Sequence, residues 1–150
     1  MMESLIFRVL DAQVIHGRAD ETAISDERGT TSFAQLLHES ASLGAGLHHM
    51  GIEVGTRVVV DLPARRDLVV AVLALARIGA VPADTADFRL VGSPPVLHAP
   101  ATEVTWEVLD RAGRVEPHPA PASDPDGYED LMRAAYGEIL ATLEAGGTIA

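Results

Sequence analysis

The chain has 150 residues, is 47% hydrophobic and carries a net charge of −11, which fits one folded domain with an apolar core. It contains no cysteine, so disulfides, thiolate metal sites and a cysteine nucleophile are excluded. All 11 positive residues are arginine, which excludes Schiff-base lysines and phosphate-loop lysines, and the acidic balance argues against binding to nucleic acid or anionic membranes.

Hydrophobic periodicity and turn residues divide the first ninety residues into short helices and strands. The predicted elements are a helix over Ser4–His16, strands over Thr22–Asp26 and Gly29–Thr31, a helix over Ser32–Met50, a strand over Arg57–Asp61, a helix over Leu68–Ile78 and a strand over Ala80–Ala83. Ser32 and Gln35 form a capping-box pattern at the start of the clearest helix. Asp67 is the predicted cap of the next helix, which is apolar nearly all round and is therefore expected to be covered on several sides.

The remaining residues have weaker patterns. They predict a strand over Pro95–Ala99, a helix from Thr102 to Arg111, a strand over Arg114–Glu116 and a last helix to about Glu144, capped by Asp126 with Glu129 at the capping-box position. Residues 117–125 contain four prolines and mark an expected boundary. Residues 1–116 are predicted to form an α/β domain, and residues 117–150 a Pro-rich arm and an amphipathic helix that pack on this domain or on a partner. The whole pattern predicts an α/β fold, a doubly wound parallel sheet with flanking helices, plus a small N-terminal β-hairpin.

Candidate metal and nucleotide residues are few. Adjacent His48 and His49 diverge by about 100° on a helix, and His38 and His49 lie about 16 Å apart, so we predict no metal site. Gly44-Ala45-Gly46 begins a dinucleotide-type glycine pattern, but it lies inside a helix, where small residues favour close helix packing.

Carboxylates near strand ends are the remaining candidates for a ligand site. Asp61 ends one strand, and Asp84 and Asp87 follow another, where α/β sheets place ligands. Helix capping and loop solubility explain these residues without a ligand, and this is the interpretation that we favour. Several other residues are predicted to have structural roles. Arg65-Arg66 form a solvated helix edge, Trp106 is a partly buried helix residue, and Asp124-Pro125-Asp126-Gly127 form a helix cap. Ser25, Ser32 and Ser40 do not lie in the Gly-x-Ser-x-Gly motif of a serine hydrolase. We therefore predict no catalytic residue and leave cofactor-binding residues unknown.

Several short motifs follow one another in the order of a known superfamily. They are Asp20-Glu21-Thr22-Ala23-Ile24, Thr31-Ser32-Phe33-Ala34-Gln35-Leu36, Leu43-Gly44-Ala45-Gly46-Leu47, Met50-Gly51-Ile52, Gly55-Thr56-Arg57-Val58 and Leu73-Ala74-Leu75-Ala76-Arg77-Ile78-Gly79-Ala80-Val81. Together they resemble the N-terminal part of the adenylate-forming superfamily of acyl-CoA synthetases and AMP-dependent ligases, over residues 4–90 only.

The resemblance implies a scaffold without the family's chemistry. Catalysis in the family needs a Ser/Thr/Gly-rich phosphate loop ending near Pro-Lys-Gly, an aspartate for the ribose, and a lysine in a separate C-terminal lid. This sequence has no such loop and no lysine, and only Pro82 remains of the family's Pro-x-x-Pro. Because adenylate formation requires stabilisation of charge on the transferring phosphoryl group, we expect no activity and no cofactor for this chain alone.

Three hypotheses about function follow from these residues. The first is a truncated, non-catalytic acyl-CoA-synthetase-like protein that acts through self-association or by binding a partner ligase or carrier protein. The second is one part of a split adenylate-forming ligase that activates a carboxylic acid with ATP. The third is a small α/β ligand-binding domain with its site near Asp61 and Asp84, and a remnant without a selected role also remains open.

The sequence also predicts where the chain works and what covers it. Glu3 stands where a signal peptide needs positive charge, and the apolar run Leu68–Ala76 is too short to span a bilayer, so a cytoplasmic protein is expected. Alone, the scaffold would expose a sheet edge and apolar surface, which either the tail Pro117–Ala150 or another chain covers. The expected partner is therefore a second copy, a larger adenylating enzyme or a carrier protein.

Overall fold

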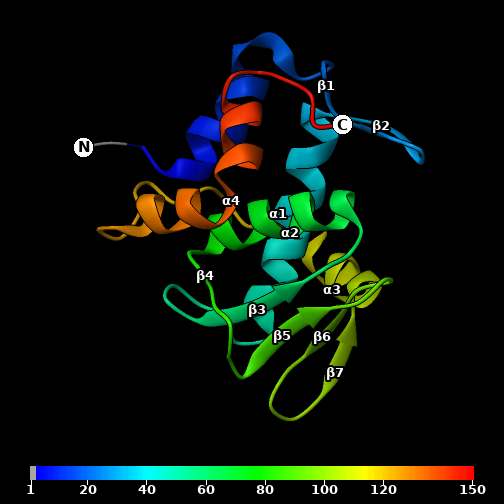
Figure 1. Ribbon diagram of the computed structural model, residues 1–150, viewed down its shortest axis with the longest axis vertical. Coiled ribbons are helices and arrows are strands. Elements are labelled where there is room, and N and C mark those ends of the chain that lie inside the picture. The colour runs from blue at the N-terminus through cyan, green and yellow to red at the C-terminus, as the bar shows by residue number, and fades with distance from the viewer. Residues whose placement is uncertain (1–2) are drawn as a thin grey trace. The chain divides into compact units, whose positions relative to one another are not determined.

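The computed structural model describes residues 3–150 (Figure 1). Its elements in chain order are the short π-helical segments η1 (Phe7–Asp11) and η2 (Val14–Arg18), β1 (Thr22–Asp26), β2 (Gly29–Ser32), α1 (Phe33–His49), β3 (Arg57–Asp61), α2 (Arg65–Ile78), β4 (Val81–Pro82), β5 (Phe88–Val91), β6 (Val96–His98), β7 (Glu103–Thr105), α3 (Trp106–Gly113) and α4 (Tyr128–Glu144). No helix in the described range 3–150 is long and apolar enough to cross a membrane.

The chain divides into two compact units, Met1–His38 with Ala120–Ala150, and Glu39–Pro119. The sequence predicts a domain over 1–116 and a Pro-rich arm with an amphipathic helix over 117–150 that packs on this domain or on a partner. In the structure, α4 belongs to the same unit as the N-terminal segment.

In the first unit, η1 packs against α4 beside a two-stranded hairpin. Fully buried apolar side chains from both segments form its core, including Leu5, Ile6, Val9, Leu10, Phe33, Met132, Leu140 and Leu143. The hairpin β1–β2 is antiparallel, as the sequence predicts. Ile149 lies on the other side of β1, because Ser25 N–H donates to its carbonyl at 2.9 Å and its own N–H donates to the carbonyl of Ala23 at 2.8 Å. The last residues of the chain therefore extend the hairpin.

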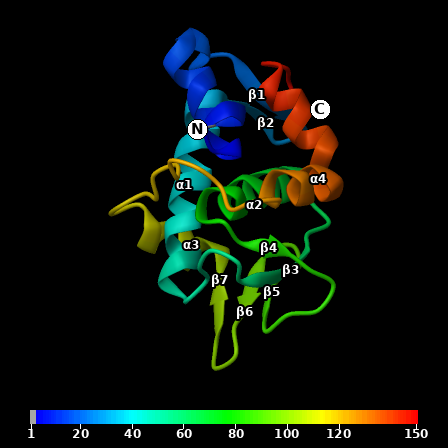
Figure 2. The same ribbon diagram turned by 90° about the vertical axis from the view of Figure 1, so that its left-hand side faces the viewer.

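The second unit contains a five-stranded sheet in the order β4-β3-β5-β6-β7, which can be followed in Figure 2. β3 pairs in parallel with β4 and β5, whereas β5, β6 and β7 pair antiparallel. Helix α2 contacts β3, and α3 contacts β7. The predicted α/β class, with parallel strands and flanking helices, is confirmed, and the sheet is mixed because two antiparallel strands continue it.

Helix α2 begins earlier than the sequence suggests. It starts at Arg65 after Ala64, so Asp67 lies in its first turn and is not the cap. Every residue from Val69 to Ile78 is buried, which confirms the expectation of a helix covered on several sides. Pro82 lies in the edge strand β4, where a missing backbone donor is tolerated.

The sequence-based boundaries of the next elements are partly wrong. The helix expected from Thr102 starts at Trp106, because Glu103–Thr105 form β7 and Thr105 caps α3 by accepting a hydrogen bond from Val108 N–H at 3.4 Å. The strand expected over Arg114–Glu116 is also wrong: these exposed residues form no strand. Phe88–Val91, to which the sequence assigned no element, form the central strand β5.

The start of the last helix also differs from its prediction. Gly127 precedes α4 and no side chain caps it, so neither Asp126 nor Glu129 has its predicted capping role. Glu129 instead forms ion pairs with Arg8 and Arg133, and the neighbouring Asp124 accepts a hydrogen bond from the backbone N–H of Leu5.

Small residues bring α1 and α3 into close contact within the second unit. A Cβ atom at Gly46 would lie 2.2 Å from the carbonyl oxygen of Leu109, and one at Gly113 would lie 1.7 Å from that of Ser42. Real Cβ atoms cannot approach a carbonyl so closely, so both glycines are required for this crossing. The structure thus confirms that Gly44-Ala45-Gly46 serves helix packing.

Candidate functional site

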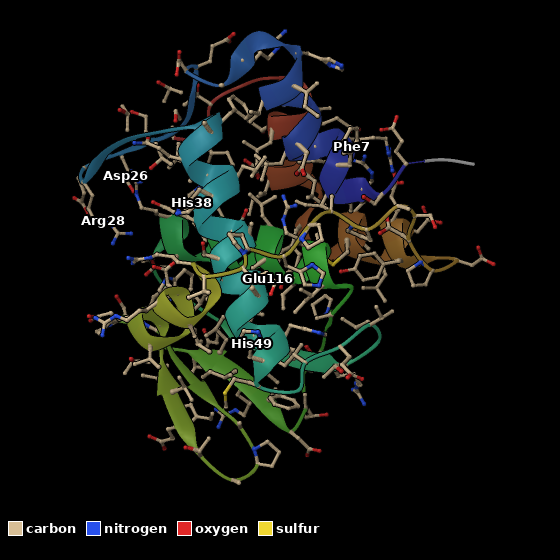
Figure 3. All side chains as sticks on the ribbon, turned by 180° about the vertical axis from the view of Figure 1, so that it is seen from behind. Phe7, Asp26, Arg28, His38, His49 and Glu116 are labelled. Carbon is tan, nitrogen blue, oxygen red and sulfur yellow. The ribbon has the colours of Figure 1, made fainter. Side chains whose placement is uncertain are left out.

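The histidines do not form a metal site. His38 and His49 lie well apart along α1 (Figure 3). His48 lies edge-on to His118, with ring centroids 5.3 Å apart, and its Nδ1 lies 3.2 Å from the carbonyl oxygen of Ile52. Across residues 3–150, no three histidine, cysteine, aspartate or glutamate side chains gather closely enough to hold a metal ion.

The carboxylates near the strand ends are not gathered into one site. Asp61 ends β3, whereas Asp87 lines a cavity beside Thr56 and Arg57, at the start of that strand. Asp84 is exposed in the short connection between β4 and β5. Strands β4 and β5 flank β3, and the connection between them returns toward the start of β3. Asp61 and Asp87 therefore lie at opposite ends of β3.

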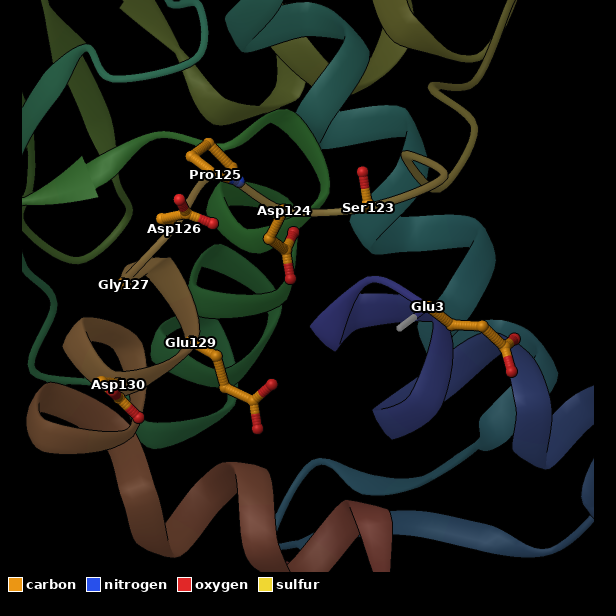
Figure 4. A pocket seen from close by; sticks show the side chains of 8 residues that line it. All are labelled: Glu3, Ser123, Asp124, Pro125, Asp126, Gly127, Glu129 and Asp130. Carbon is orange, nitrogen blue, oxygen red and sulfur yellow. The ribbon is translucent and has the colours of Figure 1, made fainter. Parts of the chain in front are cut away.

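An acidic cavity of about 630 Å³ lies in the first unit (Figure 4). Its lining residues are Glu3, Ser123, Asp124, Pro125, Asp126, Gly127, Glu129 and Asp130. Asp124 is engaged, because its Oδ2 accepts a hydrogen bond from Leu5 N–H at 2.7 Å. A cavity lined by carboxylates repels a nucleotide phosphate, so it is not suited to ATP.

Glu129 belongs to an ion-pair network that joins α4 to the N-terminal segment. It pairs with Arg8, and Arg133 Nε lies 2.9 Å from its Oε2. Arg133 Nη2 also lies 2.8 Å from Glu144 Oε1. Hydrogen bonds from Arg8 above all, and from Arg133, lower the pKa of Glu129, while hydrogen bonds to Glu129 and Glu144 raise the pKa of Arg133. The network links α4 to the N-terminal segment, and both of its glutamates already form ion pairs with arginines.

A second cavity, of about 610 Å³, lies in the other unit. Its lining residues are Gly55, Thr56, Arg57, Thr85, Ala86, Asp87 and Phe88. Arg57 and Asp87 are its only charged lining residues, and both are exposed.

One face of the five-stranded sheet in the second unit is exposed to solvent. Side chains alternate across each strand, and one set is buried: Val58, Leu90 and Leu97 are fully shielded from solvent. The opposite set is exposed or partly exposed. We call it the open face; its residues are Arg57, Val59, Asp61, Arg89, Val91, Val96, His98, Glu103 and Thr105.

Strand register arranges the open face in two rows. Val59, Arg89, His98 and Glu103 lie side by side across β3, β5, β6 and β7. Asp61, Val91, Val96 and Thr105 form the adjacent row. His98 Nδ1 lies 3.2 Å from Glu103 Oε1 within the first row.

The two kinds of strand pairing in this sheet differ in what normally covers them. Parallel strands, such as β3 with β4 and β5, normally carry helices on both faces, whereas antiparallel strands, such as β6 and β7, commonly leave one face in solvent. Val59, Val91 and Val96 are partly exposed between charged neighbours. The open face therefore combines three partly exposed valines with the charged side chains of Arg89, Asp61 and Glu103.

The sequence did not reveal this face. The alternation of Phe88, Arg89, Leu90 and Val91 signals a strand with one buried side, and this signal was available. Which strands lie beside β5, and therefore which exposed residues share a row, depends on pairings between distant segments.

Three comparisons with known proteins place these features in context. The family model described as AMP-binding enzyme matches residues 10–86, just over half of the chain. The acetyl-coenzyme A synthetase of Rhodopirellula baltica is 39% identical over 87 residues, which cover 50% of this chain and 13% of that protein. The acetyl-coenzyme A synthetase of Xylella fastidiosa is 41% identical over 71 residues, which cover 43% of this chain and 11% of that protein. The chain thus spans only a small part of the length of these relatives.

Among solved structures, the N-terminal subdomain of Klebsiella oxytoca NpsA, in complex with 3-hydroxybenzoyl-AMSN, is similar with a TM-score of 0.61 and 16% identity. The match covers 81% of this chain and 35% of that one. At this identity the likeness concerns the fold alone. Strands β5, β6 and β7, which carry most of the open face, lie beyond residues 10–86.

Proposed function

Since this chain belongs to the AMP-binding enzyme family, we propose that it is a non-catalytic member that acts through association with another protein. The chemistry that the family performs needs a phosphate-binding loop and a lysine. None of these 150 residues is a lysine, and none of its loops is rich in serine, threonine and glycine. The chain therefore carries the scaffold of the family without the groups that adenylate a carboxylic acid.

The observation that carries this proposal is the combination of family membership with the open face. One cavity is lined by several carboxylates and the other by a single arginine beside Asp87, so neither gathers the several cationic side chains that neutralise a triphosphate. The open face, in contrast, presents three partly exposed valines beside charges of both signs, so a protein partner that covers it removes apolar area from water and can pair with these charges.

An exchange assay tests the proposal. The purified chain is mixed with ATP, magnesium, labelled pyrophosphate and a panel of short-chain, long-chain and aromatic carboxylic acids, and a complete acetyl-CoA synthetase serves as the positive control. We expect no exchange above the background without enzyme. Exchange by the chain alone would overturn the proposal. Exchange only after addition of a second polypeptide that carries the loop and the lysine would support the split-ligase alternative.

The same proposal includes the chain's partners and cofactors. We propose a second copy, a larger adenylating enzyme or a carrier protein as the partner, no bound cofactor for the chain alone, and a cytoplasmic location. A purified chain that binds ATP stoichiometrically in calorimetry would contradict the absence of a cofactor.

A further inference from the structure

We propose that the open face is the surface through which two copies of this chain associate, about a two-fold axis that runs along β6. This inference rests on the proposed function, because it names the partner and the surface of the association. The occupant is a second copy, and the argument for it is charge complementarity within the rows of the face.

The first row places opposite charges symmetrically about β6. Arg89 on β5 and Glu103 on β7 are the two neighbours of His98 in this row. Rotation by 180° about an axis along β6 exchanges the positions of β5 and β7. Arg89 of each copy then faces the partner's Glu103, so one geometric relationship creates two equivalent ion pairs.

The second row supplies the apolar contact. The same rotation places Val96 against the partner's Val96 and Val91 against the partner's Thr105, next to the axis. These side chains are partly exposed in the single chain, so stacking two sheets about 10 Å apart removes their apolar area from water. The rotation also places His98 against the partner's His98 on the axis.

The size of the face limits the strength of the dimer. The open face lies on β3, β5, β6 and β7, which have 5, 4, 3 and 3 residues. Four strands about 4.8 Å apart and of these lengths present a patch of roughly 14 Å by 10 to 16 Å. This is smaller than the roughly 800 Å² per partner that stable complexes bury. We therefore expect a dissociation constant in the micromolar range, on the order of 10 to 100 µM, and a dimer that weakens as salt rises.

Sedimentation equilibrium of the 150-residue chain over a wide concentration range tests the inference. Arg89→Glu and Glu103→Arg should each weaken dimerisation at least about tenfold, because each places like charges in contact twice. The double variant should restore dimerisation to within about threefold of the original, because it re-forms both pairs with reversed polarity. Val96→Asp is a further variant on the axis and should abolish the dimer.

The control is a charge reversal of the same kind outside the open face. Arg111→Glu on α3 changes an exposed arginine whose partner, Glu107, lies one turn away on the same helix. This variant should leave the dimerisation constant unchanged, and circular dichroism should show that all variants are folded.

Three results would overturn the inference: a monomer at all concentrations, a dimer that is insensitive to the single variants, or a double variant that stays as weak as the singles. Each of these leaves the proposed function untouched, since another partner or surface would still serve it. Exchange activity of the chain alone removes the proposed function while leaving the dimer measurable, so the two failures are distinguishable.

Discussion

The carboxylate of Asp124 accepts a hydrogen bond from the backbone N–H of Leu5, 119 residues earlier in the chain, at 2.7 Å. Leu5 is fully buried at the start of the first helical segment, where the backbone N–H groups lack partners within the helix. Asp124, at the end of the Pro-rich segment, therefore caps the first helical segment of the chain. Burial raises the pKa of Tyr128, and the nearby carboxylate of Asp124 raises it further.

Loss of this cap should destabilise the protein. We expect Asp124→Ala to lower the free energy of unfolding in urea by about 1 kcal/mol, the usual cost of removing a capping side chain. Asp124→Asn retains an oxygen acceptor and should lose less than half of that amount. Asp126→Ala removes a neighbouring exposed carboxylate that caps no helix, and it should change the stability by less than about 0.5 kcal/mol. Equal losses at Asp124 and Asp126 would contradict the capping role.

The network around Glu129 should make stability depend on pH. The pKa of Glu129 is lower in the folded chain than in the unfolded chain, so its contribution to stability is present above the unfolded pKa and is lost as the pH falls through the folded pKa. We expect Glu129→Gln to cost about 0.5 to 1 kcal/mol at pH 7, in the range of partly exposed ion pairs, and to cost almost nothing well below pH 4. Urea unfolding of both proteins at several pH values measures this difference.

Asp130→Asn is the matched control for the charge change. Asp130 lies next to Glu129 in the first turn of α4 and also lines the acidic cavity. Its substitution should produce a much smaller difference across the same pH range. A Glu129→Gln penalty that is constant from pH 7 to well below pH 4 would show that packing, and not charge, holds the two segments together.

The glycines between α1 and α3 should tolerate no side chain. Gly113→Ala places a Cβ atom 1.7 Å from the carbonyl oxygen of Ser42, so the helices must separate, and we expect a loss of about 3 kcal/mol or more in thermal unfolding. Gly137→Ala, in α4, meets no atom within 4 Å and should be neutral or stabilising by about 0.5 to 1 kcal/mol. If both variants were equally stable, the close approach of the helices would be refuted.

The capping box of α1 gives a prediction in which sequence and structure agree. Ser32 Oγ accepts from Gln35 N–H at 3.1 Å, and Gln35 Oε1 accepts from Ser32 N–H at 2.8 Å. We expect Ser32→Ala to reduce the free energy of unfolding by about 1 kcal/mol. Ser25→Ala, at an exposed position of β1, should change it by less than about 0.5 kcal/mol, and a similar loss at both positions would speak against the cap.

Features that depend on residues close together in the chain could be predicted from the sequence. The capping box at Ser32, the hairpin at residues 22–32, the parallel-strand pattern of residues 57–61 and the small residues at 44–46 are local signals, because their hydrogen bonds or periodicity join residues a few positions apart. The missing lysine is likewise a property of composition alone.

The other features could not be predicted from the sequence, because they depend on contacts between distant segments of the chain. The sequence predicts a helix from Thr102, but the pairing of β7 with β6 places residues 103–105 in a strand and makes Thr105 the cap of α3. The sequence predicts Asp126 as the cap of the last helix, whereas in the structure Asp124 caps the segment that begins near Leu5. The open face has the same origin: each strand shows only its own alternation, and strand pairing decides that Arg89, His98 and Glu103 form one row on an uncovered side of the sheet.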